Sequence, residues 1–260
     1  MQITSSSNER IKHARRVREG RESGLIFIEG LRLAEEAVNS GLIIESCFSI
    51  PTEDQRTITL LSKLNDRDIP IYLTLPSILE SLGDTVQTQG VILIARRPHL
   101  ATLDFFQPKG TLFLAMDRVQ DPGNMGTLLR TAEAAGTNGI MTLGGSVDVC
   151  SPKVLRSSMG SAFRLPVLTQ VTPESLIALK AEHQLQLVAA AGEGDLDYTD
   201  YDWSQPTILL LGNEGRGVDP DILKQCDALL RIPMAPQVES LNVATAGAVM
   251  LFEASRQRRK

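Results

Sequence analysis

Three polar loops in the C-terminal half of the chain restrict its fold more than any other feature. Each follows an apolar run and leads into a helical pattern; the loops are DRVQDPGNMGTLLRTAEAAG (117–136), LLLGNEGRGVDPD (209–221) and RIPMAPQVESLNVATAGAVMLFEA (231–254). Strands that alternate with helices favour a parallel sheet, which binds ligands at the carboxyl ends of its strands. Three loops of this composition therefore predict one composite site.

The first loop combines a tight turn with the start of a helix. Asn124 ends the turn DPGN and is a good N-cap for that helix. Apolar residues then recur at helical spacing up to Gly136, a typical C-cap. Arg130 lies off this apolar stripe. Such a position is usual for an exposed helix charge, but a neighbouring turn rich in glycine and asparagine also fits a functional cation.

The other two loops carry the remaining polar candidates. Glu214 lies among glycines that permit positive φ or close approach of a ligand, namely Gly212, Gly215 and Gly217. Asp219 is expected to cap the next helix, with Pro220 at its first position. Ser240 and Asn242 precede an alanine-rich helix whose apolar stripe we predict to consist of Val243, Ala246, Gly247, Met250 and Ala254. A capping role, worth about 1 kcal/mol, explains one of these two polar residues well and both poorly.

Composition excludes several classes of protein. A chain of 260 residues with 42% hydrophobic content can build one large or two ordinary domains. No apolar run approaches the roughly 18 to 20 residues of a membrane span, and the polar start lacks a secretion signal, so we expect a cytoplasmic protein without membrane contact. Three cysteines and three histidines are dispersed without a CxxC pair, which argues against a metal site or a disulfide framework.

The net charge of −5 argues against indiscriminate nucleic-acid binding, but basic residues are concentrated in two places. One is the C-terminus, 256–260. The other is an expected helix at 8–20, which contains Arg10, Lys12, Arg15, Arg16 and Arg18. Charge alone favours solvated helix faces for both, although local basic strips on an acidic protein can still dock phosphates.

The periodicity divides the chain into two α/β units. Residues 1–95 form a smaller unit, with helices expected at 8–20, 31–40, 53–65 and from Pro76, and strands at 25–28, 43–50, 69–73 and 91–95. Residues 96–110 contain two prolines and lose periodicity, as a linker does. In residues 111–260, apolar strands at 111–116, 139–143, 165–171, 186–191, 207–211 and 229–233 predict a mostly parallel sheet with helices on both faces.

Common nucleotide and hydrolase motifs are absent. GNEGRG has GxxGxG spacing, unlike the GxGxxG of a dinucleotide-binding turn, and there is no Walker A sequence and no GxSxG elbow. The turn AAAGEGD (189–195) is a weak candidate for a Rossmann-type nucleotide site. A nucleotide-dependent oxidoreductase or a Rossmann-type small-molecule methyltransferase would need a glycine fingerprint after the strand at 111–116, where DRVQDPGN stands instead.

Together, NMGTLLRTAEAAG, LLLGNEGRGV and RIPM with VESLNVATAGAVMLFE closely resemble the three motifs of the SpoU (TrmH-type) RNA ribose 2′-O-methyltransferases of the SPOUT superfamily. The resemblance extends over residues 110–260. The pattern IFIEGLRLAEEAV (26–38) is similar to the substrate-binding domain of many rRNA-modifying members. The family implies a deep trefoil knot in the C-terminal domain and a homodimer with the site at the subunit interface, to which the helix at 242–256 would contribute.

The resemblance also implies the ligands and the site. Its cofactor is S-adenosylmethionine, and the matching cofactor-binding positions are Ala191, Gly192, Leu211, Gly212, Ile232 and Leu241. Its catalytic positions match Asn124, Arg130, Glu214, Ser240 and Asn242. Its substrate is structured RNA, for which the N-terminal domain favours large-subunit rRNA over tRNA, and the five basic residues of the helix at 8–20 are then predicted to contact the RNA backbone.

Arg130 is the family's usual candidate for the key catalytic group. A guanidinium with a pKa above about 12 is a poor base, so we assign Arg130 first to binding phosphate and orienting the hydroxyl, with proton acceptance left open. Asn124 and Glu214 would fix Arg130 and the loops, and Ser240 and Asn242 would order the third loop. The alternatives are a tRNA 2′-O-methyltransferase and a catalytically silent RNA-binding module of the same fold.

Overall fold

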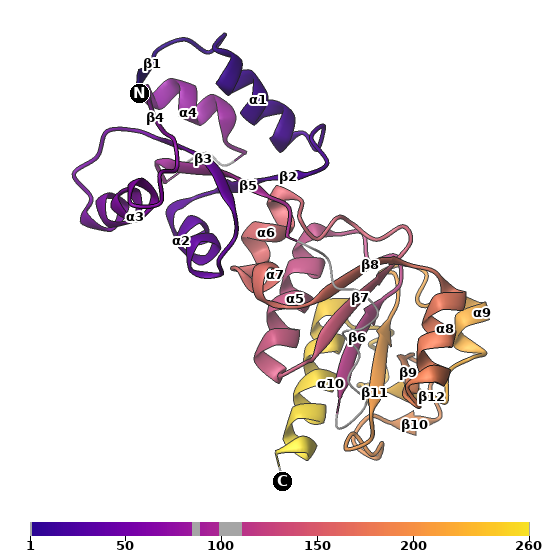
Figure 1. Ribbon diagram of the computed structural model, residues 1–260. Helices are drawn as coiled ribbons and strands as arrows, with labels where there is room; N and C mark the ends of the chain where they lie inside the picture. The colour runs from indigo at the N-terminus through magenta and orange to yellow at the C-terminus, as the bar shows by residue number, and fades with distance from the viewer. Residues whose placement is uncertain (1, 85–88, 99–110, 260) are drawn as a thin grey trace. The chain divides into compact units, whose positions relative to one another are not determined.

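The computed structural model describes residues 2–84, 89–98 and 111–259 (Figure 1). The chain divides into two compact units, one comprising Met1–His99 with Val149–Arg164 and the other Leu100–Asp148 with Leu165–Lys260. Most of the expected linker at 96–110 lies outside the described residues. No helix in the described parts of the chain has the length and apolar character of a membrane span.

The first unit is built on a five-stranded mixed sheet of order β1-β4-β3-β5-β2. Strand β4 is parallel to β1 and β3, whereas β5 is antiparallel to β2 and β3. The strands are β1 (Gln2–Ile3), β2 (Leu25–Glu29), β3 (Ile44–Ser49), β4 (Ile71–Thr74) and β5 (Val91–Arg96), and the helices are α1 (Glu9–Arg18), α2 (Leu31–Asn39), α3 (Gln55–Asn65) and α4 (Pro76–Leu82). All four helices and the last four strands match the sequence predictions to within a few residues; the short β1 was not predicted.

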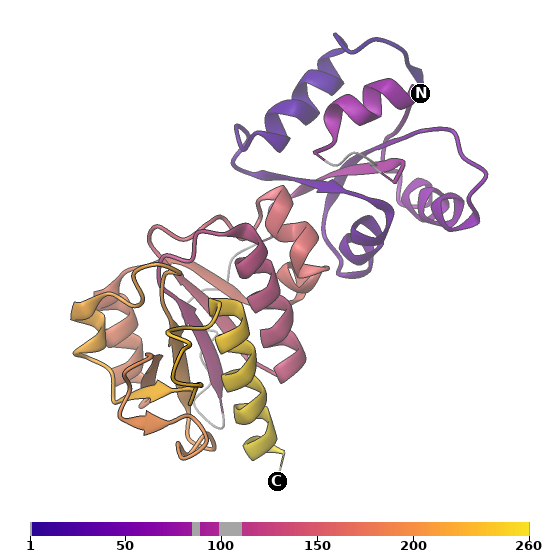
Figure 2. The same cartoon turned by 180° about the vertical axis from the view of Figure 1, so that it is seen from behind.

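Helices α1 and α4 cover one face of this sheet, and α2 and α3 cover the other (Figures 1 and 2). Helix α1 begins because the side chain of Asn8 accepts a hydrogen bond from the amide of Arg10. Its buried residues, Ile11, Ala14 and Val17, recur every three positions and join a core that includes α4 and the sheet. This spacing keeps the arginines and lysine of α1 out of that core.

Two short helices of the first unit come from a distant part of the sequence. They are α6 (Pro152–Ser158) and α7 (Ser161–Arg164), and neither was predicted from the sequence. The guanidinium of Arg156 donates to the buried carboxylate of Glu29 over 3.2 Å, and Arg164 pairs with Glu36 on α2. These ion pairs fix the segment on β2 and α2.

The second unit contains a seven-stranded sheet of order β10-β12-β9-β11-β6-β7-β8, in which every neighbouring pair is parallel. The strands are β6 (Leu112–Met116), β7 (Gly139–Leu143), β8 (Val167–Val171), β9 (Gln186–Ala190), β10 (Leu196–Asp197), β11 (Thr207–Leu211) and β12 (Ala228–Arg231). The parallel sheet and six of its strands confirm the prediction. Strand β10 is too short to produce a periodic signal.

Helices cover both faces of this sheet, as predicted (Figures 1 and 2). Helices α5 (Pro122–Ala135) and α10 (Val243–Arg258) lie on one face, and α8 (Pro173–Glu182) and α9 (Pro220–Leu223) lie on the other. Gly247 allows α10 to approach closely, because a Cβ there would lie 2.5 Å from Leu128 of α5 and 2.7 Å from Leu211 of β11. The absence of a side chain at Gly247 therefore permits close packing of α10 against α5 and β11.

Candidate active site

The three loops of the sequence prediction meet at the carboxyl ends of the parallel strands. The first loop follows β6 and the second follows β11; these strands are neighbours, with Met116 in register with Leu211. The third loop follows β12, which β9 separates from β11. Because all these strands run in the same direction, their following loops share one edge of the sheet.

A chain of side-chain hydrogen bonds joins one residue from each loop. The Nδ2 of Asn124 donates to Glu214 over 3.1 Å, and its Oδ1 accepts from the Nδ2 of Asn242 over 3.0 Å. Asn242 also accepts from the amides of Ala244 and Thr245 with its Oδ1. Asn124 therefore bridges the second and third loops, so the three loops come together as the sequence predicted.

The expected capping role of Asn124 is wrong. Helix α5 begins at Pro122, and its N-cap is Asp121, whose side chain accepts from the amide of Asn124 over 2.8 Å. Asp is as good an N-cap as Asn, and a following proline is favoured at the first helical position. This arrangement leaves the whole amide group of Asn124 available to the other two loops.

Asn242 and Ser240 have different positions at the start of α10. Asn242 is the N-cap of that helix, as its spacing allowed. The exposed Ser240 makes no hydrogen bond within the described residues and lines a cavity between the second and third loops. A capping role thus explains only Asn242.

Arg130 lies apart from this hydrogen-bonded chain. It is exposed on α5, six residues and about 9 Å of helix rise beyond Asn124. Within the parts of the chain that are described, its guanidinium has no hydrogen-bond or ion-pair partner, and it does not line the cavity. The structure therefore brings together four of the five predicted catalytic residues and leaves the fifth on the adjoining helix surface.

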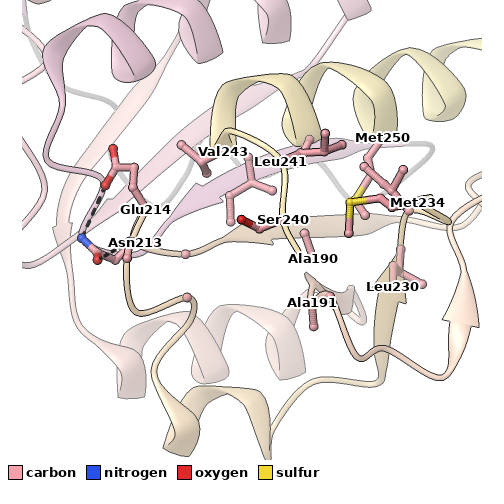
Figure 3. A pocket seen from close by; sticks show the side chains of 17 residues that line it. Ala190, Ala191, Asn213, Glu214, Leu230, Met234, Ser240, Leu241, Val243 and Met250 are labelled. Carbon is pink, nitrogen blue, oxygen red and sulfur yellow. Dashed lines mark hydrogen bonds between the residues drawn. The ribbon is translucent and has the colours of Figure 1, made fainter. Parts of the chain in front are cut away.

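A cavity of about 300 Å³ opens beside these loops (Figure 3). All six predicted cofactor positions line it: Ala191, Gly192, Leu211, Gly212, Ile232 and Leu241. Glu214 and Ser240 add polar groups to a mostly apolar wall. A volume of this size with few polar groups is usual for a small-molecule site.

The cavity wall also contains residues that the sequence analysis assigned elsewhere or overlooked. Val243, Ala246 and Met250 of α10 line the cavity, whereas Gly247 and Ala254 belong to the buried side of the helix. Met250 is buried as well, and at 100° per residue the five predicted positions lie within about 100° of the helix, so they form one apolar stripe whose edge borders the cavity. Other lining residues not singled out from the sequence are Ala190, Asn213, Leu230 and Met234.

Glycine is required at position 212, directly after β11. A Cβ on Gly212 would lie 2.1 Å from the amide nitrogen of Val218 and 2.2 Å from the carbonyl carbon of Gly217. Gly217 itself has φ +66°. The backbone of the second loop thus folds back on the end of β11, as the glycine content suggested.

The hydrogen bonds around Glu214 lower its pKa. Burial alone would raise the pKa of this carboxyl, but hydrogen bonds from Asn124 and from the amides of Asp121 and Gln120 outweigh that effect. A lowered pKa in the folded state stabilises the protein above the ordinary value of 4.5, and this contribution is lost as the pH falls through the folded-state pKa.

We therefore expect acid to weaken the loop assembly through Glu214. The melting temperature of the protein should fall more steeply below pH 4.5 than that of a Glu214→Gln variant, which has no carboxyl to protonate at this position. Thermal melts across this range, followed by circular dichroism, measure the difference. Parallel curves for the two proteins would show that Glu214 does not contribute.

The five basic residues of α1 have different surroundings. Arg10 stacks on the ring of Tyr72, with its guanidinium carbon 4.3 Å from the ring centroid. Exposed ion pairs join Lys12 to Glu9 and Arg16 to Glu22, and pairs of this kind are weak enough for phosphates to compete. The guanidinium of Arg15 has no partner within the described residues.

Arg18 is tied to the fold. It donates hydrogen bonds to the carbonyls of Leu82 and Gly83 at the end of α4, over 2.9 and 3.3 Å. A cation at this position satisfies the unpaired carbonyls and the negative end of the helix dipole. Arg18 therefore fastens α1 to α4.

This difference gives a matched pair of variants. We expect Arg18→Ala to lower the free energy of unfolding by about 1 to 2 kcal/mol, because it removes two hydrogen bonds from a cation. Arg15→Ala should change it by less than about 0.5 kcal/mol. Urea unfolding of both variants measures the effect; equal stabilities would contradict the structural role of Arg18.

Within the described residues, no group of three or more His, Cys, Asp or Glu side chains gathers as a metal site would. The thiols of Cys47 and Cys226 are shielded from water, and burial raises their pKa to about 12 and about 11. Such thiols are poor nucleophiles and poor ligands at neutral pH.

Comparison with known proteins agrees with this geometry. Residues 111–252 match the SpoU rRNA Methylase family, and residues 27–101 match RNA 2′-O ribose methyltransferase substrate binding. The chain is 36% identical to an uncharacterized tRNA/rRNA methyltransferase of Synechocystis sp., over 98% of this chain and 94% of the relative. It is 33% identical to the 23S rRNA (guanosine(2553)-2′-O)-methyltransferase RlmP of Bacillus subtilis, over 96% and 98% of the two chains.

Solved structures are similar over nearly the whole chain. An AdoMet-bound rRNA methyltransferase from Sinorhizobium meliloti aligns with a TM-score of 0.88 and 31% identity, over 98% of this chain and 97% of that one. The SpoU methyltransferase AviRb from Streptomyces viridochromogenes, in complex with the cofactor AdoMet, aligns with a TM-score of 0.87 and 28% identity, over 97% and 99%. On its sequence, its fold and its three converging loops, this chain belongs to the SpoU rRNA methylase family.

Proposed function

We propose that this chain transfers the methyl group of S-adenosylmethionine to a ribose 2′-hydroxyl of 23S rRNA. One observation supports the proposal most strongly. Asn124 bridges Glu214 and Asn242 through hydrogen bonds, beside a cavity that all six expected cofactor positions line. The related proteins named as 23S rRNA 2′-O-methyltransferases and the AdoMet-bound neighbours support the same reaction.

The residues of the cavity fit the methyl donor. Apolar side chains from the second and third loops suit the adenosine and the methylene groups, and Glu214 gives the mouth a negative charge that favours a sulfonium cation. The close packing at Gly212 holds the backbone of the second loop in one conformation. When bound, S-adenosylmethionine supplies an electrophilic methyl group.

The protein's own residues would prepare the nucleophile. Arg130 has an exposed guanidinium that no described residue pairs with, which suits binding of an RNA phosphate and orientation of the ribose hydroxyl. Asn124 and Glu214 would fix the first two loops, while Ser240 and Asn242 would order the third. Reaction requires the hydroxyl oxygen to approach in line with the methyl group as its proton leaves. That proton passes to Arg130 or to solvent water.

The proposed enzyme is a homodimer with a deep trefoil knot in residues 111–260. Exposed apolar side chains on and near α10 support a subunit interface: Phe252 is 47% exposed and Leu241 is 38% exposed. A second subunit that covered Leu241 would also close the cavity. Arg130 lies outside the cavity of its own chain, which agrees with a site completed at an interface.

Residues 1–95, on which α6 and α7 pack, would form the RNA-binding domain, and the rest of residues 111–260 the methyltransferase domain, with a linker at 96–110. The RNA backbone would be contacted by the basic side chains of α1, namely Arg10, Lys12, Arg15 and Arg16. Arg18 would also contact it, in addition to joining α1 to α4. The names of the relatives favour rRNA over tRNA, and a cytoplasmic location would accompany that substrate.

Two measurements test the function. Ribose methylation mapped across total RNA should lose one position when the gene is deleted and regain it when the gene is restored. The purified protein should transfer tritiated methyl groups to rRNA from the deletion strain but not to rRNA from the parent. Binding of that rRNA without transfer would instead favour a silent RNA-binding module, and loss of a methyl group from tRNA would favour the tRNA alternative.

A further inference from the structure

The amide of Asn213 organises the second loop from within. Its Oδ1 accepts hydrogen bonds from the amides of Gly215 and Arg216, over 3.0 and 3.1 Å. Its backbone exchanges two hydrogen bonds with Gly217, over 3.0 and 2.9 Å. These four bonds close the turn that carries Glu214, and Figure 3 shows Asn213 beside Glu214 in this turn.

The same side chain also ties this turn to the first loop. The Nδ2 of Asn213 donates to the backbone carbonyl of Arg118 over 2.8 Å. Arg118 has φ +55°, a left-handed conformation that is uncommon for a residue other than glycine. Strained backbone of this kind persists where the surrounding structure holds it.

The contacts of Arg118 supply that support. Its guanidinium donates two hydrogen bonds to the buried carboxylate of Asp117, over 3.0 and 2.8 Å. Its side-chain stem passes Gly145, where a Cβ would lie 3.2 Å from the Cγ of Arg118. Asp117 also accepts from the amide of Asp219 over 2.8 Å. The second loop is thus attached to the first at its beginning, Asn213, and at its end, Asp219.

We propose that Asn213 is a positioning residue for methyl transfer. Its bond to the backbone carbonyl of Arg118, a residue in the left-handed conformation, holds the second loop against the first. In this position Glu214 reaches Asn124, and the glycine backbone of the second loop forms part of the cavity wall. The proposal rests on the proposed function and adds a residue to its site. A role confined to closing the turn would require only the Oδ1 of Asn213. The bond from Nδ2 to Arg118 joins two loops, and it can be removed separately.

Asn213→Asp is the variant that separates these two roles. A carboxylate still accepts from Gly215 and Arg216, but it cannot donate to Arg118. It also replaces the hydrogen bond that the Nδ2 of Asn213 donates to the Oε2 of Glu214, over 3.4 Å, with repulsion between two carboxylates. In a Glu214→Gln background the glutamine amide can donate to the new carboxylate, which removes the repulsion and retains a bond between residues 213 and 214. A defect that persists there therefore belongs to the lost bond with Arg118.

The matched control is Asn138→Ala. The Oδ1 of Asn138 accepts one hydrogen bond, from the amide of Leu112 over 2.9 Å, and its residue lies at the opposite, amino end of the strands. The variant loses a comparable side-chain-to-backbone bond away from the three loops. Its affinity for S-adenosylhomocysteine should therefore equal that of the wild type.

The readouts are the Kd of S-adenosylhomocysteine by calorimetry, kcat and KM on rRNA, and hydrogen exchange of individual amides. We expect Asn213→Asp to raise the Kd of S-adenosylhomocysteine at least about fivefold, both in the wild type and in the Glu214→Gln background, relative to each parent protein. The KM for RNA should stay within about twofold of the parent value. The amides of Gly215 and Arg216 should stay protected, while that of Asp121, which donates to Glu214, should exchange faster.

Two results would overturn the positioning role. One is an Asn213→Asp variant that binds S-adenosylhomocysteine as tightly as the wild type and shows unchanged hydrogen exchange at the amide of Asp121. The other is a binding defect that disappears when Asn213→Asp is made in the Glu214→Gln background. Failure of the proposed function is distinguishable, because it would appear as absent methyl transfer in the wild type. The exchange of Asp121 tests the placement of Glu214 without any methyl transfer.

Discussion

Replacing Arg130 with alanine is expected to reduce kcat for methyl transfer at least about 100-fold while leaving the affinity for S-adenosylmethionine unchanged. Removal of a preorganised group that acts on the reacting atoms typically has an effect of this size. Donor binding should be preserved because Arg130 does not line the cavity. Stability should be preserved because the side chain is exposed and has no partner within the described residues.

Single-turnover transfer of tritiated methyl groups to undermethylated rRNA measures this effect, with calorimetry of S-adenosylhomocysteine in parallel. Lys63→Ala removes another exposed helical cation, from α3, and is expected to retain wild-type kcat. Arg130→Lys separates charge from geometry, because lysine keeps the charge but cannot form two parallel hydrogen bonds to a phosphate. Near wild-type transfer by Arg130→Ala would refute the assignment.

Gly212→Ala should prevent binding of the methyl donor S-adenosylmethionine and destabilise the protein. The added Cβ would lie about 2 Å from backbone atoms of Gly217 and Val218, and backbone cannot yield as the end of a flexible side chain does. We expect the free energy of unfolding to fall by about 2 to 3 kcal/mol and the Kd of S-adenosylhomocysteine to rise at least about 100-fold.

Gly215→Ala is the matched control from the same loop. The nearest atom to a Cβ at Gly215 is the Oδ1 of Asn213 at 3.7 Å, an ordinary van der Waals contact. Its stability should therefore stay within about 0.5 kcal/mol of wild type in urea unfolding. If both alanine variants unfolded at the same urea concentration, the close approach at Gly212 would not have the importance that its geometry indicates.

Most of the second sheet could be predicted from the sequence because its strands are buried on both faces. Such strands are continuous apolar runs, as in TLFLAM at β6 and TILLL at β11. Helices α6 and α7 escaped prediction because they have seven and four residues, too few for a periodic pattern. Their position on β2 depends on the Glu29–Arg156 ion pair, which joins residues 127 positions apart.

The candidate site was predictable to the extent that its residues lie in loops that follow strands. Glu214, Ser240 and Asn242 could be selected in this way, and the resemblance to the family supplied the cofactor positions. The N-cap of α5 was misassigned because Asp121 and Asn124 are both good caps, and local sequence does not rank them. The tether from Asn213 to Arg118 was not predictable, since its acceptor is a backbone carbonyl whose orientation depends on a left-handed arginine.

One amide group in this site serves two structures at once. The oxygen of Asn242 holds the first turn of α10, while its nitrogen holds Asn124 and, through it, Glu214. Fraying at the start of that helix and separation of the three loops are consequently the same event. Moderate warming should then release the methyl donor while the seven-stranded sheet remains folded.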